Sequence, residues 1–153
     1  MIADNITKMI GEALKAHDEL RLSTLRMLSS ALNYGFIEKQ HKLNDEEEIA
    51  VVKKEAKMRK DAIEAYEKAG AIARADKERQ ELKILQEFLP VEMSDEELKK
   101  LVSEAIKMAD LPAGATHQAL QAGMGKVIGL VMAKAKGRAD GSKVAQLVKS
   151  HLG

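Results

Sequence analysis

The chain has 153 residues, with 25 Lys and Arg against 24 Asp and Glu, no Cys, no Trp and only 3% aromatic residues. Without Cys there is no disulfide framework and no thiolate metal site, and the four His residues lack metal-ligand spacing, so we expect no metal and no cofactor. Ala, Leu, Lys, Glu, Met and Ile dominate, which is typical of helices packed by aliphatic side chains.

Charge is distributed unevenly along the chain. Residues 111–153 hold six basic residues and one acid, a net charge of +5, whereas the remainder holds 19 basic and 23 acidic residues, a net charge of −4. A positive C-terminal third attracts polyanions. The N-terminus has no basic stretch followed by an apolar one, and the longest strongly apolar run, 127–133, is too short to span a bilayer. We therefore expect a cytoplasmic protein with no membrane partner.

Two amphipathic helices are predicted at the start of the chain. Apolar residues recur at helical spacing over 6–14, behind Asp4 or Asn5 as a possible N-cap, and the same pattern returns over 22–36. Arg21 and Arg26 flank the apolar run of the second helix, and the sequence alone gives them no role.

A long third helix follows Asn44 or Asp45 as its cap and carries an apolar stripe over 49–66. It is predicted to end at Gly70, the residue type that best tolerates a left-handed terminal conformation. Arg59 falls on the apolar side of this helix, where we expect it either to extend its charged end to solvent or to pair with an acid across the bundle.

A fourth helix over 76–89 is predicted to stop at Pro90, because proline has no amide hydrogen to continue the ladder. We place a domain boundary here, with an N-terminal helical bundle over residues 1–90 and a small C-terminal helical domain over 91–153.

The C-terminal domain begins with a capping box. Ser94 and Glu97 have the S-x-x-E spacing in front of apolar residues at helical intervals, which predicts a helix from about Asp95 that ends in the segment 110–116. A helix from about His117 to Lys134, broken near Gly123, and a last helix over 140–152 complete the prediction. The fold class is therefore all-α, with about four N-terminal and about three C-terminal helices.

Small residues form a stripe on the sixth predicted helix. A glycine inside a helix lowers the stability of the helix by about 1 kcal/mol relative to Ala, so its presence there needs a reason. The stripe lets another backbone approach closely: either a neighbouring helix of the same domain or an RNA sugar–phosphate backbone, with Lys126 and Lys136 on either side. Its members, at spacings of three and four, are Ala122, Gly125, Gly129 and Ala133.

The stretch AKAKGRADGSKVAQ, residues 133–146, is predicted to be a joint between helices, with Gly137 at the end of one and Asp140 capping the next. Cations around a helix N-terminus favour a bound phosphate, although Asp140 would already satisfy one or two of the free amides. Phosphate contact and a solvated surface remain the alternatives. The candidate RNA-binding residues are Lys126, Lys134, Lys136, Arg138 and Lys143.

No catalytic residue is predicted. The serines lack a partner base at helical spacing, and GMGKVIG, residues 123–129, is not a phosphate loop because Leu120 and Val127 stand where that motif needs Gly and Ser or Thr. We expect the chain not to be catalytic by itself.

Five blocks resemble a known family in collinear order: RLSTLRMLSSALN, KMRKDAIEAYEKAG, LQEFLP, MGKVIGLVM and KGRADGSKV. They resemble the stand-alone YqeY family, which is similar to the C-terminal tail domain of the B subunit of glutamyl/aspartyl-tRNA amidotransferase. The resemblance implies an all-helical two-part architecture, contact with tRNA and with amidotransferase subunits, and an association with carbon–nitrogen ligase activity that uses glutamine as amide donor.

Two functions follow as predictions. In the first, the chain is a tRNA-binding or accessory module linked to glutamine-dependent transamidation, because its basic C-terminal part can neutralise phosphates. The alternative is a protein-interaction module that docks on an amidotransferase or another partner without touching RNA. The sequence does not indicate an oligomeric state.

Overall fold

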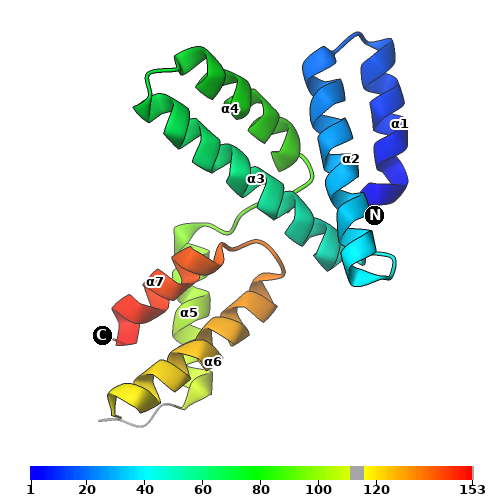
Figure 1. Ribbon diagram of the computed structural model, residues 1–153. Coiled ribbons are helices and arrows are strands. Elements are labelled where there is room, and N and C mark those ends of the chain that lie inside the picture. Colours follow the sequence, from blue (N-terminus) through cyan, green and yellow to red (C-terminus); the bar gives the residue numbers. More distant parts are fainter. Residues whose placement is uncertain (111–115, 153) are drawn as a thin grey trace. The chain divides into compact units, whose positions relative to one another are not determined.

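The computed structural model describes residues 1–110 and 116–152, and these contain seven α-helices and no strand. The chain divides into two compact units, an N-terminal unit of Met1–Leu89 and a C-terminal unit of Pro90–Gly153 (Figure 1). Four helices lie in the first and three in the second, which confirms the predicted all-α class.

The N-terminal unit consists of two antiparallel helical hairpins. One joins α1 (Ile2–Lys15) to α2 (Glu19–Lys39), and the other joins α3 (Asp45–Lys68) to α4 (Ile72–Gln86). The hairpins splay apart from the region where α2 meets α3 (Figure 1). Apolar side chains from all four helices and from the α2–α3 loop form the core of this unit: Ile6, Leu28, Leu32, Leu43, Val52 and Leu85.

The start of α1 differs from the sequence prediction. Helix α1 begins at Ile2, so Asp4 and Asn5 lie within it and the prediction that one of them is the cap is wrong. The amides of Ile2 and Ala3 donate instead to the carboxylate of Glu48 in α3, which is 1% exposed. A residue distant in sequence therefore satisfies the orphan amides that begin this helix.

Helix α3 has the local signals that predict it. The side chain of Asn44 accepts from the Glu47 amide at 3.0 Å, and the Glu47 carboxylate accepts from the Asn44 amide, so a capping box is complete. The backbone hydrogen bond from Asn44 lowers the pKa of Glu47. Gly70 follows the helix with φ +71°, the left-handed conformation that glycine tolerates best.

Arg59 is buried between α3 and α4 and pairs with several acids. Its Nε donates to Glu81 at 3.1 Å, one Nη donates to Glu55 at 3.0 Å, and Glu78 lies 3.8 Å from Nε. The other Nη is 3.7 Å from the sulfur of Met27 in α2. Of the two alternatives for this residue, pairing across the bundle is the one observed.

The C-terminal unit is a three-helix arrangement of α5 (Asp95–Ala109), α6 (His117–Ala135) and α7 (Gly141–Leu152). Ser94 and Glu97 form the predicted capping box at the start of α5. Residues 111–115 of the segment predicted to end α5 lie outside the described residues. Helix α6 is continuous, so the break predicted near Gly123 is wrong; Gly123 is buried among the residues that face the unit's interior.

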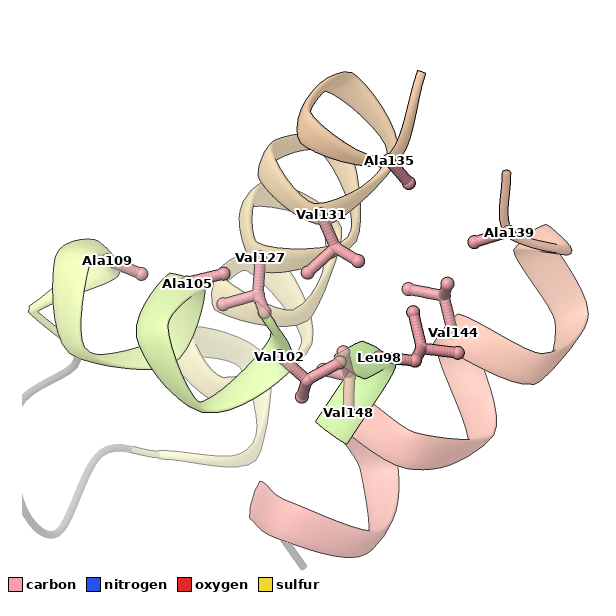
Figure 2. Packing of buried hydrophobic residues seen from close by; sticks show 10 residues of the cluster. All are labelled: Leu98, Val102, Ala105, Ala109, Val127, Val131, Ala135, Ala139, Val144 and Val148. Atoms are coloured by element: carbon pink, nitrogen blue, oxygen red, sulfur yellow. The ribbon is translucent and has the colours of Figure 1, made fainter. Parts of the chain in front are cut away.

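The fully buried core of the C-terminal unit is made almost entirely of short side chains, and longer, partly buried ones such as Met124 and Leu147 pack around it. Valines and alanines of α6 and α7 face those of α5, with Leu98 as the one larger member (Figure 2). Short side chains let the helices approach closely and still fill the space between them.

No helix in the described part of the chain is long and apolar enough to cross a membrane.

Candidate nucleic-acid interface

The predicted small-residue stripe lies on the solvent-exposed side of α6. All four members, Ala122, Gly125, Gly129 and Ala133, are exposed, whereas the opposite side of the helix is buried against α5 and α7. Lys126 belongs to the exposed side, because residues three and four apart are neighbours on a helix and it therefore lies beside both Ala122 and Gly129. Helix α6 contains no Asp or Glu.

Among the described residues, no helix of the same unit packs on the two glycines of this stripe. A Cβ built on Gly125 or Gly129 would meet no described atom within 4 Å outside the helix's own backbone. The interpretation in which the stripe packs against a neighbouring helix of the same domain is therefore wrong for these two glycines. Periodicity places the small residues on one face, but it does not say whether that face points to the core or to solvent.

Replacing Gly129 with Ala is expected to raise the free energy of unfolding by about 0.5–1 kcal/mol, because an exposed mid-helix glycine loses backbone entropy without packing in return. Urea unfolding followed by circular dichroism measures this. The matched control is Gly35→Ala in α2, where the new Cβ would lie 3.1 Å from a Leu43 methyl carbon and gain little or destabilise. A destabilised Gly129→Ala variant would contradict the assignment of an open face.

The candidate RNA-binding lysines differ in their surroundings. The ammonium groups of Lys126 and Lys136 are exposed and make no ion pair or hydrogen bond with any described residue. Lys136 ends α6 in a left-handed conformation with φ +46°. The ammonium of Lys134 lies 3.4 Å from the sulfur of Met108 in α5, which leaves its charge without a counterion in the described residues.

Arg138 connects the α6–α7 joint to the chain segment before α5. Its Nε donates to the carbonyl of Val91 at 2.9 Å, a guanidinium nitrogen lies 3.6 Å from Glu97, and its own carbonyl accepts from the Met93 amide at 2.8 Å. The guanidinium thus has a role in holding this unit together, which the local sequence did not indicate. The predicted phosphate contact at Arg138 stays a prediction.

The N-terminus of α7 is already capped. One carboxylate oxygen of Asp140 accepts from the amides of Ser142 at 2.7 Å and Lys143 at 3.3 Å, which are groups that a phosphate would otherwise use. The Lys143 ammonium pairs with Asp95 at the start of α5. This hydrogen bond lowers the pKa of Asp95 and raises that of Lys143. The arrangement favours Lys126 and Lys136, rather than Arg138 and Lys143, as the residues available to a polyanion.

The described residues do not assemble a metal site. No three or more His, Asp or Glu side chains among residues 1–110 and 116–152 lie close enough together to hold a metal ion. All side-chain nitrogen and oxygen atoms that are buried in the described part of the chain have a hydrogen-bond partner.

Comparison with known proteins identifies the family. The model of the YqeY family, described as Yqey-like protein, matches residues 3–152. The chain belongs to the YqeY family. This YqeY-family chain is also similar to uncharacterized protein C22F3.15 of Schizosaccharomyces pombe, with 31% identity over 90 residues, which are 59% of this chain and 73% of the relative. The family assignment confirms the resemblance carried by the five sequence blocks.

Proposed function

We propose that this YqeY-family protein is an RNA-binding accessory module that contacts tRNA through the exposed side of α6. The observation that carries the proposal is the placement of Lys126, which has no counterion among the described residues, in an exposed row of small residues where Gly125 and Gly129 meet no described neighbour. A polyanionic backbone can approach such a surface closely, and the two free ammonium groups then neutralise phosphates.

The expected recognition is by shape and charge. All the aromatic residues of the chain precede Pro90, so base stacking on Tyr or Phe has no part in binding at α6. The similarity of the family to the amidotransferase B-subunit tail supports tRNA as the RNA and transamidation as the process. The chain's role in that process is to bind, since we assign it no catalytic residue.

A salt-dependent gel shift with total tRNA tests the proposal. Affinity should fall steeply between about 50 and 200 mM salt, and Lys126→Glu combined with Lys136→Glu should weaken binding at least about tenfold and reduce the salt slope by about two. Lys100→Glu is the matched control, because Lys100 is an exposed, unpaired lysine on α5. Arg138 and Lys143 are unsuitable targets, since their substitution would break contacts within the unit.

Two results would contradict the proposal: no retention of tRNA by the unaltered chain, or equal retention by the double variant and the control. The second candidate function is docking on an amidotransferase subunit, which the same uncovered surface favours because close approach suits a helix as well as a phosphate backbone. Nuclease-treated pull-down with a purified amidotransferase B subunit separates the two, since a protein contact survives both nuclease and high salt.

A further inference from the structure

A second surface feature lies in the N-terminal unit, beside α2 and α4. It is an open hollow of about 770 Å³, within the size range of small-molecule sites. Five lining residues come from α2 and one from α4, so the hollow lies between the two hairpins. They are Glu19, Leu20, Leu22, Ser23, Arg26 and Lys77.

Arg26 is unlike the other arginines in the described residues. Each of the others has a partner: a carboxylate for Arg21, Arg59, Arg79 and Arg138, and the ring of Tyr66, 5.9 Å away, for Arg74. The guanidinium of Arg26 makes no ion pair, hydrogen bond or ring contact with the described residues. A planar guanidinium is the side chain best suited to bind an oxyanion.

Lys77 supplies a second free cation from the opposite wall. The acids nearest to it on α4 are engaged elsewhere, because Asp76 pairs with Arg79 and Glu78 lies against Arg59. The Lys77 ammonium therefore has no counterion among the described residues. Two unneutralised charges, one from each hairpin, border the same hollow, and Glu19 is the only acid in its lining.

We propose that this hollow binds a phosphate monoester carried on an apolar body, such as a mononucleotide. A phosphate monoester carries nearly two negative charges at pH 7 and three acceptor oxygens, so one group can neutralise both Arg26 and Lys77, whereas a carboxylate carries only one charge. Leu20 and Leu22 offer apolar contact to the body of the ligand, and the carboxylate of Glu19 accepts hydrogen bonds from sugar hydroxyls. The openness of the hollow makes the expected affinity weak.

Nuclear magnetic resonance titration of the full-length ¹⁵N-labelled chain with AMP tests the proposal. Saturable shifts are expected for amides of residues 19–26 and 77, with weaker effects from adenosine, which lacks the charge, and from inorganic phosphate, which lacks the apolar body. Binding should be tighter at pH 7.5 than at about pH 5, because the phosphate gains its second charge near pH 6. Arg26→Ala combined with Lys77→Ala should weaken binding at least about tenfold.

The control is Lys57→Ala, which removes an exposed, unpaired cation of α3 that does not line the hollow. A parallel titration with a short RNA carrying a 5′-phosphate, compared with the same RNA ending in a 5′-hydroxyl, identifies the source of the phosphate. Tighter binding of the phosphorylated RNA than of AMP assigns the hollow to an RNA terminus, and the reverse assigns it to a free nucleotide. Absence of shifts with both, or equal shifts in the double variant, overturns the proposal.

Discussion

Replacing Arg59 with Met is expected to lower the free energy of unfolding of the N-terminal unit by about 3–5 kcal/mol, because it leaves buried carboxylate charge without its partner. Glu81 is 5% exposed, and Glu55 also loses the charged donor that it contacts in the native fold. Both tyrosines, Tyr34 and Tyr66, lie in this unit, so urea unfolding followed by tyrosine fluorescence reports on it selectively.

The double variant Arg59→Met with Glu81→Met tests whether the instability comes from the unpaired carboxylate of Glu81 or from the loss of the Arg59 side chain itself. Replacing both partners by apolar side chains of similar length removes the most buried of the three carboxylates around Arg59, so most of the stability should return. Lys57→Met, an exposed neighbour, should change stability by less than about 0.5 kcal/mol. A single variant as stable as this control would mean that the buried cluster does not hold α3 to α4.

Replacing Leu98 with Ala should have a comparable effect on the C-terminal unit. Leu98 is the largest buried side chain of its core and is 1% exposed, so its truncation should remove about 2.7–5 kcal/mol through lost burial and a residual cavity. The free energy of unfolding of a unit of roughly 60 residues is only about 3–9 kcal/mol in total. We therefore expect loss of dispersed amide resonances for residues 95–152 in a ¹⁵N correlation spectrum at 37 °C.

Leu101→Ala is the matched control for this experiment. Leu101 lies on the same helix and packs against the same cluster, but it is only partly buried, so its truncation should leave the spectrum of the C-terminal unit dispersed. If both variants kept equally dispersed spectra, the burial of Leu98 would not be essential for the folding of the C-terminal unit.

Local signals in the sequence predicted local structure well. The two capping boxes, Asn44 with Glu47 and Ser94 with Glu97, start helices where the spacing indicated, because every group involved lies within four residues. The all-α class could also be predicted, because helical periodicity too relates residues only three or four positions apart. The cap of α1 was missed because its acceptor, Glu48, is 46 residues away from Ile2.

The candidate site was harder to predict, since it depends on contacts between distant segments. Arg138 and Lys143 lie in a basic stretch of the sequence that contains few acids. In the structure their partners Glu97 and Asp95 come from the start of another helix. The sequence also could not show that Arg26 makes no ion pair with the described residues, because this depends on which cations the nearby carboxylates contact in the fold. In each case the one-dimensional pattern gives the charge of a residue and not its neighbour.

The valine-rich core of the C-terminal unit has a consequence for how that unit responds to a bound partner. Valine is stiff about its first side-chain torsion, and alanine has no rotamers, so these residues have few alternative arrangements to adopt. We therefore expect these innermost residues to repack little when the outer side of α6 is contacted. A partner would then meet a helix whose inner side is held in one arrangement, and the adjustment on binding is expected from the partner and from the longer side chains around the core, such as Met124 and Met132.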